Sequence, residues 1–432
     1  TDGLWHHSRV DPLDPELVRD LARPQAYPDD PSAADGVECI QTHLSYVFLS
    51  RDRVAKLRKA VSLSFVSFAD RTRRNADCLH ELTLNRRLAP DVYLGVAEVV
   101  PGGSGYRLGP LLANPTHLRE DREHCVIMKR LPEGHDARSL VARGDLTPEA
   151  IDRVARVVAR FHRAEGLGRP APFSPTDWWR RNHDPATANF EILEKAGCAR
   201  LELAEVRDTA EQTRARLDAL GPVIEARRAH GCAVHGHGDL HLQHVWFPDL
   251  AGDPLIIDCV EFSESLRKID AASEVAFLAM DLTYAGAGAL AERFLAHYAS
   301  QADDFSLYDV VDLFISYRAA VRAKVAALAS VDPVIADEQR AREAEAAERY
   351  LTLARAALEP RPVAPFWLVS GAVGSGKSTV ARELAELTGA AIVSSDRVRK
   401  QARGLDPERP ASPAEQAEMY APERVAAVYD AV

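Results

Sequence analysis

The chain has 432 residues, 46% of them hydrophobic and 27% charged, and its formal net charge is −11. This composition is typical of a globular protein of two or three domains, and the negative balance excludes a global basic field for nucleic acid. The cysteines are scattered without a Cys-x-x-Cys pair, and no apolar run approaches the roughly 20 residues of a membrane span. The sequence therefore predicts a cytoplasmic protein with reduced thiols and no membrane partner.

The first third of the chain favours strands around one helix. Residues 1–36 are rich in proline and aspartate and are expected to form an N-terminal extension with a short helix at 15–22. Alternating apolar residues predict strands at 54–57, 92–100 and 125–128, within a region 37–135. Between the first two strands, residues 70–88 have helical periodicity.

The next two hundred residues favour helices. Periodic apolar positions predict helices at 148–165, 188–229, 269–299, 306–330 and 335–358, interrupted by short strands and loops at 232–262. This region, 136–358, ends at a proline-rich linker, 359–365, because proline cannot continue a helix. Residues 366–432 follow as a last domain.

The last domain opens on a phosphate-binding loop. The pattern G-x-x-x-x-G-K-[ST] follows an apolar run at 366–369, expected to be a strand, and precedes a helical stretch. Glycines admit the phosphates, the lysine neutralises them, and the next hydroxyl can ligate Mg²⁺. The segment therefore predicts ATP binding with Mg²⁺, through Gly371, Gly374, Gly376, Lys377, Ser378 and Thr379.

A second parallel strand is expected at 390–394, followed by a possible acceptor site. In this place Asp396 resembles the carboxylate that orients the acceptor hydroxyl in small P-loop kinases, and Arg399 resembles the acceptor-binding arginine of polynucleotide kinases. Asp396 is also compatible with a helix N-cap. A nucleic-acid partner rests on these two residues alone. Residues 366–432 are too few to complete a parallel sheet, so the α/β P-loop domain is expected to be incomplete.

A second constellation lies upstream, in His-Gly-His-Gly-Asp-Leu-His-Leu-Gln-His at 235–244, followed by Asp258. Phosphoryl transfer needs two such acids, one to take the proton of an acceptor hydroxyl and one to hold the Mg²⁺ that bridges nucleotide phosphates. Lys56, on a predicted strand, and Glu81, on the following helix, have the arrangement of the Lys–Glu pair that positions α- and β-phosphates.

The motifs His237-Gly-Asp239-Leu-His241 and Ile257-Asp258 resemble the aminoglycoside-phosphotransferase branch of the protein-kinase-like superfamily. The closer resemblance is to bacterial proteins that fuse such a domain to a C-terminal P-loop kinase. It implies an α+β two-lobed kinase-like domain with ATP between lobe 37–135 and helical lobe 136–358, followed by the α/β P-loop domain. The roles it implies are phosphate contact for Lys56, its ion-pair partner for Glu81, a hinge beside adenine for Met128 to Leu131, catalytic base for Asp239 and metal ligand for Asp258.

One position departs from the family pattern. The asparagine that normally follows the catalytic aspartate by five residues, and binds the second Mg²⁺, is His244 here. Imidazole can ligate a metal but matches Mg²⁺ less well than an amide oxygen. Two interpretations remain open. One is an active kinase for a small hydroxylated acceptor such as a sugar or aminoglycoside-like molecule. The other is a catalytically reduced module that regulates a P-loop kinase of polynucleotides or small molecules.

Two further patterns are ambiguous. His235, His237, Asp239 and His241 superficially resemble the H-x-H-x-D-H zinc cluster of metallo-hydrolases, but Leu240 separates Asp239 from His241 and the helical surroundings do not suit that fold. In the helical lobe, acidic residues are compatible with a pocket for a cationic acceptor and, more readily, with solvated helix faces. These residues are Glu264, Asp270, Glu274 and Asp281.

Overall fold

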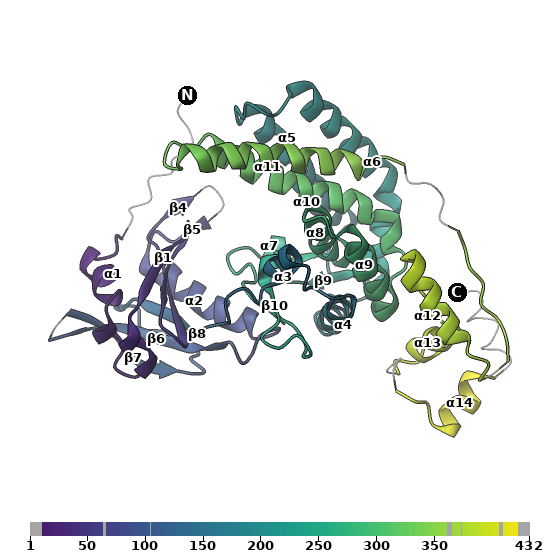
Figure 1. The fold of residues 1–432 in the computed structure, drawn as a ribbon, viewed down its shortest axis with the longest axis horizontal. Helices are drawn as coiled ribbons and strands as arrows, with labels where there is room; N and C mark the ends of the chain where they lie inside the picture. The colour runs from purple at the N-terminus through teal and green to yellow at the C-terminus, as the bar shows by residue number, and fades with distance from the viewer. Residues whose placement is uncertain are drawn as a thin grey trace. The chain divides into compact units, whose positions relative to one another are not determined.

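The computed structural model describes residues 11–63, 66–103, 105–360, 365–372, 374–405 and 409–421. The chain divides into two compact units, one of Thr1–Arg143 with His237–Lys268 and the other of Gly144–Gly236 with Ile269–Val432 (Figure 1). The segment 237–268 thus joins the N-terminal unit although some ninety residues separate it from that unit in sequence. The predicted α+β fold class is confirmed, whereas the domain boundaries drawn from the sequence stay predictions.

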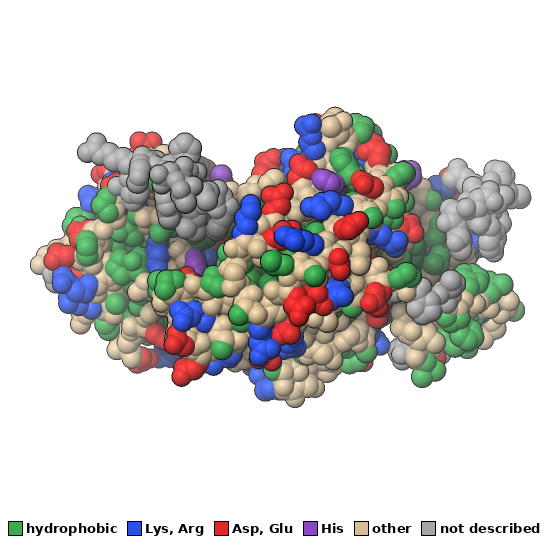
Figure 2. All heavy atoms as spheres, turned by 90° about the horizontal axis from the view of Figure 1, so that it is seen from above, with side chains coloured by type: hydrophobic (Ala, Val, Ile, Leu, Met, Phe, Trp, Pro, Cys, Tyr) green, Lys and Arg blue, Asp and Glu red, His purple; other side chains and the backbone are tan. Residues whose placement is uncertain are grey.

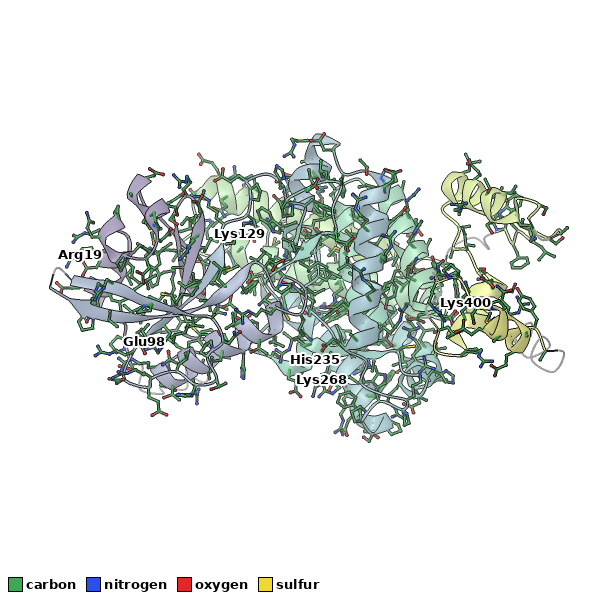
Figure 3. The ribbon with its side chains drawn as sticks, turned by 90° about the horizontal axis from the view of Figure 1, so that it is seen from below. Arg19, Glu98, Lys129, His235, Lys268 and Lys400 are labelled. Atoms are coloured by element: carbon green, nitrogen blue, oxygen red, sulfur yellow. The ribbon has the colours of Figure 1, made fainter. Side chains whose placement is uncertain are left out.

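A six-stranded antiparallel sheet forms the centre of the first unit, in the order β1-β2-β3-β8-β6-β7. In that order the strands are β1 (Glu38–Gln41), β2 (Ser45–Leu49), β3 (Arg53–Arg58), β8 (His124–Lys129), β6 (Tyr93–Gly102) and β7 (Gly105–Leu112). Short pairs add β4 (Ser62–Leu63), β5 (Val66–Ser67), β10 (Val245–Trp246) and β11 (Leu255–Ile256). Figure 3 labels Glu98 on β6 and Lys129 at the end of β8. The strands predicted at 54–57, 92–100 and 125–128 are confirmed as β3, β6 and β8.

Alternation along β3 sends its side chains to two different environments. Ala55 and Leu57 lie in an apolar cluster together with Leu17 and Leu21 of α1 (Pro15–Leu21). Successive strand residues point to opposite faces, so Lys56 and Arg58 point the other way, toward α2 (Arg71–Asn85), where both form ion pairs. The N-terminal segment expected as an extension therefore contributes to the core of this unit, through α1, η1 (Pro24–Ala26) and η2 (Pro31–Asp35).

Helix α2 presents one stripe to the sheet and another to the charged end of β3. Its N-cap Asp70 accepts a hydrogen bond from the Arg73 amide, and its apolar residues Cys78 and Leu82 join a cluster with Val126 and Met128 of β8. Asp77, Glu81 and Asn85 are four residues apart, so they share one side of the helix. All three are buried, which requires polar partners for each of them.

The second unit is helical, and Figure 2 shows acidic and basic side chains interspersed on the face it presents. Two predicted long helices are wrong in extent. Residues 188–229 belong to two helices, α5 (Pro175–Lys195) and α6 (Leu203–His230), because the chain turns at Gly197 with φ of 70°. Residues 269–299 divide into α8 (Ala271–Tyr284) and α9 (Gly288–Ala302) around Gly286, whose φ is 83°. A left-handed glycine ends a helix at low energetic cost.

The remaining elements complete the helical core. They are α4 (Pro148–Ala164), α10 (Leu307–Ser330), α11 (Asp337–Ala356) and β9 (Ala233–His235), with α3 (Ala137–Arg143), η3 (Leu242–His244), α7 (Glu264–Arg267) and β12 (Lys268–Asp270) elsewhere in the chain. None of the helices in the ranges that the structure describes is both long and apolar enough to cross a membrane.

The acidic residues of α8 are structural rather than solvated. Asp270 is fully buried and pairs with Arg227 at 2.7 Å, and Glu274 is 1% exposed and lies 2.8 Å from His162 Nε2. Asp281 is buried too, whereas Glu264 is exposed and pairs with Lys268 at 2.8 Å. For Asp270, Glu274 and Asp281 the expectation of a solvated helix face is therefore wrong, because all three carboxylates are buried. Asp270 forms an ion pair with Arg227, and Glu274 lies within hydrogen-bond distance of His162.

The C-terminal segment contains α12 (Lys377–Thr388), α13 (Ser395–Gln401) and α14 (Pro413–Met419). The strands predicted at 366–369 and 390–394 are not formed, and no residue among 365–372, 374–405 and 409–421 is in a strand. Phe366 and Leu368 are 89% and 81% exposed. An apolar strand is stable only when a neighbour pairs with its backbone, and the described residues provide no such neighbour here.

Candidate functional site

Lys56 lies at the centre of a charged site in the first unit. Its Nζ is 2.8 Å from Glu81 Oε1 and 2.9 Å from Asp258 Oδ1, so it connects β3, α2 and the loop after β11. The lysine and glutamate side chains are 14% and 1% exposed, whereas that of Asp258 is 46% exposed. The buried pair therefore holds the ammonium group in place, and the aspartate lies at the accessible end.

The loop that carries Asp258 is held by two hydrogen bonds from its backbone amides to side chains. The Asp258 amide donates to the hydroxyl of Tyr93 at 3.1 Å, and the Cys259 amide donates to Asn85 Oδ1 of α2 at 2.8 Å. Asp258 has φ of 63°, a left-handed conformation that aspartate tolerates better than most residues. These contacts tie the position of Asp258 to that of Glu81, since Asn85 and Glu81 are on the same helix.

The loop that carries Asp239 is fastened to the Asp258 loop. His237 Nε2 donates to the Ile257 carbonyl at 2.8 Å, and the Val260 amide donates back to the His237 carbonyl at 3.1 Å. Gly238 separates His237 from Asp239 with φ of 87°, and a Cβ there would lie 2.9 Å from the Leu266 carbonyl oxygen. Only glycine fits this turn, so the sequence Gly-Asp is needed to aim Asp239.

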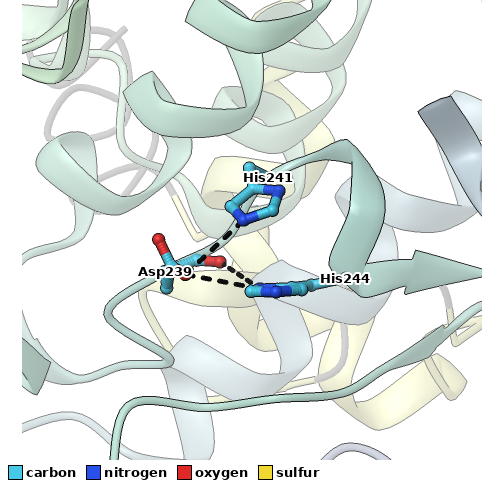
Figure 4. Close-up of side chains that lie close together, drawn as sticks. All are labelled: Asp239, His241 and His244. Atoms are coloured by element: carbon cyan, nitrogen blue, oxygen red, sulfur yellow. Dashed lines mark hydrogen bonds and ion pairs between the residues drawn. The ribbon is translucent and has the colours of Figure 1, made fainter. Parts of the chain in front are cut away.

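Two histidines flank the Asp239 carboxylate (Figure 4). Its Oδ2 is 3.5 Å from His241 Nε2 and 3.6 Å from His244 Nδ1. The rings of His241 and His244 lie against each other with centroids 3.9 Å apart. On its other edge, His244 Nε2 is 3.6 Å from Asp258 Oδ2, so this imidazole stands between the two aspartates.

The charges of the site favour ionised aspartates and a neutral His244. Lys56 holds the pKa of Asp258 far below its usual range. Burial alone would raise the pKa of Asp239, but the hydrogen bond from His241 and the proximity of His244 lower it well below its usual range. Burial, with His241 close by, lowers the pKa of His244 to about 4. At neutral pH, Asp239 is therefore an ionised acceptor for a proton.

A buried acidic cluster around Arg58 supports this site, and the sequence reading did not find it. The guanidinium contacts Asp77 and Glu261 and lies 2.8 Å from both Glu81 Oε2 and Ser45 Oγ. Arg58 is 3% exposed and Glu81 is 1% exposed. Two spacings in the sequence could have predicted this cluster. Arg58 follows Lys56 by two residues, which places them on the same face of a strand, and Asp77 precedes Glu81 by four, which places them on the same side of a helix.

Glu261 makes the stability of this unit depend on pH. Burial raises its pKa to about 8, since three carboxyl groups surround one guanidinium. Between the usual carboxyl pKa and pH 8 the folded state keeps a proton that the unfolded chain has released. The stabilisation is thus present at acid pH and is lost as the pH rises through 8.

We expect Glu261→Gln to stabilise the first unit by about 1–3 kcal/mol at pH 8 and by much less at pH 5. Hydrogen exchange of the α2 amides at both pH values measures this difference, with the exposed Glu120→Gln as the matched control. An equal effect of Glu261→Gln at the two pH values would contradict the assignment of the proton to Glu261.

Met128, expected beside the adenine, lies at an apolar part of the first unit. Met128 is 9% exposed in the apolar cluster that Leu131, Leu255 and Ile257 also contact.

Lys377 begins α12, and its Nζ donates to the carbonyls of Gly371 at 2.9 Å and Ala372 at 2.7 Å. Gly374 and Gly376 have φ of 78° and 84°, and Ser378 and Thr379 are exposed in the first helical turn. The loop therefore has the left-handed glycines and the helix N-terminus of a phosphate site.

The proposed acceptor residues of the last segment have other partners in the structure. Asp396 lies in the first turn of α13 and pairs with Lys400 at 3.0 Å (Lys400 is labelled in Figure 3). Arg399 is 6% exposed and lies over the ring of Tyr420, 4.7 Å from its centroid. Their roles as base and anion clamp stay predictions.

A Lys–Glu pair, two loop aspartates and a downstream glycine-rich loop are the features expected of a phosphotransferase followed by a P-loop segment. Residues 55–314 match the family model described as "Phosphotransferase enzyme family", and residues 366–431 match an "AAA domain" model. The chain belongs to the phosphotransferase enzyme family. The predicted fusion of such a domain to a C-terminal P-loop segment is confirmed.

Relatives and solved structures resemble the chain over much of its length. "Uncharacterized protein Mb2027c" of Mycobacterium bovis is 31% identical over 378 residues, covering 85% of this chain and 68% of that protein. A glucosamine kinase structure is 18% identical with a TM-score of 0.40, covering 78% of this chain and 82% of the other. A choline/ethanolamine kinase family protein from Mesorhizobium loti is 14% identical with a TM-score of 0.41, covering 78% and 99%. At these scores neither kinase's substrate is carried over to this chain.

Proposed function

We propose that this chain transfers the γ-phosphoryl group of ATP to a hydroxyl group of a small molecule, a sugar or an aminoglycoside-like compound. The observation that carries the proposal is the arrangement around Lys56, which joins Glu81 and Asp258 while His244 links Asp258 to Asp239. An ammonium group, a metal-binding carboxylate and a second carboxylate are the parts that phosphoryl transfer requires.

Each residue has a role that follows from its surroundings. Lys56, whose pKa is raised by Asp258 and Glu81 despite burial, stays charged and contacts the nucleotide phosphates. Asp239 accepts the proton of the acceptor hydroxyl as the new O–P bond forms, the bond to the β-phosphate oxygen breaks, and ADP leaves. His241 keeps the carboxylate oriented, since its Nε2 faces Asp239 Oδ2. Met128 lines the adenine side of the nucleotide.

The donor set fits a divalent cation. Asp258 gives Oδ1 to Lys56 and turns Oδ2 toward His244 Nε2, so a carboxylate oxygen and an imidazole nitrogen converge on one place. A divalent cation bound there would neutralise charge on the nucleotide phosphates. At the second nucleotide site, Lys377 donates to the carbonyls of Gly371 and Ala372 and would donate to phosphate oxygens when a nucleotide is bound. Ser378 would hold the accompanying cation.

The two nucleotide sites can be separated by one pair of substitutions in the full chain. We expect Lys56→Met to lower acceptor-dependent ADP release about a hundredfold or more, because the phosphates lose their positioning charge. Lys377→Ala should leave that release within about twofold and remove one of two nucleotide-binding events in calorimetry, because it disables only the P-loop.

A screen of hydroxylated acceptors, measured as ADP release with both variants in parallel, tests the proposal. Acceptor-dependent release that survives Lys56→Met and disappears with Lys377→Ala would instead assign the chemistry to the P-loop segment. The N-terminal unit would then be the regulatory module of the alternative interpretation.

A further inference from the structure

The three histidines of the catalytic loop have tautomers that their backbone contacts determine. His237 donates through Nε2 to a carbonyl, and its Nδ1 accepts from the Asp239 amide at 3.3 Å. His241 Nδ1 accepts from the Gln243 amide at 3.3 Å, so its proton is on Nε2, toward Asp239. His244 is the reverse case, because its Nδ1 lies 2.8 Å from the Asp239 carbonyl oxygen and must donate to it.

His244 therefore has its lone pair on Nε2, the nitrogen that faces Asp258. The two atoms are 3.6 Å apart, which is longer than a hydrogen bond. Two ligands of one cation, each bonded at about 2.0–2.2 Å in tetrahedral geometry, are about 3.4 Å apart. The gap between Nε2 and Oδ2 thus has nearly the size that one bridging cation needs.

The surroundings hold the imidazole in a ligating orientation. A metal-binding histidine usually donates its other ring N–H to a carbonyl or carboxylate, as His244 does to the Asp239 carbonyl. The His241 ring lies against His244 with its plane tilted by 35° and limits rotation of that imidazole, and Lys56 holds the other oxygen of Asp258. The side chain of His244 is 15% exposed, so few waters compete for Nε2.

We propose that His244 Nε2 and Asp258 Oδ2 form a cation site that takes a divalent first-row transition ion such as Mn²⁺, Co²⁺ or Zn²⁺ in preference to Mg²⁺. Imidazole nitrogen suits these ions, whereas Mg²⁺ demands oxygen ligands. Its role as the cation that accompanies ATP rests on the proposed function, but the nitrogen ligation does not.

An alternative ligand set is less compatible with the contacts. Asp239, His241 and His244 also offer ligand atoms within 4.8 Å of one another. Using His241 Nε2 and His244 Nδ1 would require both rings to shift their protons and would break the bonds to the Gln243 amide and the Asp239 carbonyl. The site at Asp258 needs neither change, and it leaves Asp239 available to the acceptor.

Binding of Mn²⁺ alone to the full chain, without nucleotide, tests the proposal by electron paramagnetic resonance. We expect spin-echo spectra of the bound ion to show nitrogen hyperfine modulation in the parent protein. In His244→Asn the modulation should disappear, and the preference for Mn²⁺ over Mg²⁺ in competition should fall about tenfold because an amide oxygen replaces nitrogen. The exposed His80→Asn is the matched control and should change neither quantity.

Two further variants test the same cation site. His244→Gln serves if His244→Asn fails to fold. Asp239→Asn should retain the nitrogen modulation. Three results would overturn the proposal. They are no nitrogen modulation in the parent protein, loss of the modulation in Asp239→Asn, or modulation that persists in the His244 variants. Acceptor-dependent ADP release is measured on the same samples. Transfer without nitrogen modulation defeats only the cation assignment, whereas modulation without transfer defeats only the proposed function.

Discussion

We expect Asp239→Asn to lower kcat for acceptor-dependent phosphoryl transfer by about a thousandfold, because the amide cannot take the proton of the attacking hydroxyl. Asparagine has the shape of aspartate, and its amide oxygen can still face His241 Nε2, which lies 3.5 Å from Asp239 Oδ2 in the parent protein. Nucleotide binding should change little, since Lys56 and Asp258 hold the phosphate end of the site. Steady-state ADP release with saturating ATP measures the effect.

The control for this variant is Asp253→Asn, an exposed aspartate between β10 and β11. It should leave kcat within about twofold, as a surface substitution away from the site does. If Asp239→Asn instead raised KM and left kcat intact, Asp239 would be an acceptor-binding residue and the assignment of the base would be wrong.

We expect Arg58→Met to lower the free energy of unfolding of the first unit by about 3–5 kcal/mol. The guanidinium is 3% exposed and faces Asp77, Glu81 and Glu261. Its removal takes the paired cation from Asp77 and Glu261 and leaves Glu81 with Lys56 alone. Methionine keeps much of the volume, which limits the contribution of a cavity. Hydrogen exchange of the β3 and α2 amides reports this loss locally.

Arg58→Met is compared with an exposed arginine variant and with a double variant. Arg51→Met removes a guanidinium that is 61% exposed and pairs with Asp35 and Asp52, and should change the free energy by less than about 1 kcal/mol. Adding Glu261→Gln to Arg58→Met should restore part of the loss, because it removes one of the unpaired carboxyl groups. Equal losses for Arg51→Met and Arg58→Met would mean that the cluster is not a stabilising one.

The sequence was informative where function depends on local pattern. Alternation identified β3 as a strand that carries Lys56, because a strand has a fixed period of two. It did not identify Arg58. The glycine spacing at 371–376 identified the phosphate loop, since a close approach to phosphates needs a backbone without side chains. Asp239 and Asp258 were found through their motifs, and the family match supports the domain in which they lie.

The sequence was less informative where helices end and strands pair. The boundaries within 175–230 and 271–302 depended on left-handed turns at Gly197 and Gly286, which periodicity does not register. The expected strands at 366–369 and 390–394 had suitable composition, but β-structure depends on a partner that composition cannot supply.

What the sequence by itself determined is therefore the class of chemistry: a phosphate loop, a lysine on a strand and two loop aspartates, each encoded within a few neighbouring residues. Only the tertiary structure decided how those groups act together. It brought Arg58 to acids from α2 and the Asp258 loop, and it set the tautomer of His244 through the Asp239 carbonyl. Burial and hydrogen bonding fix the charge and proton of each group, and both arise from residues that are far apart in the chain.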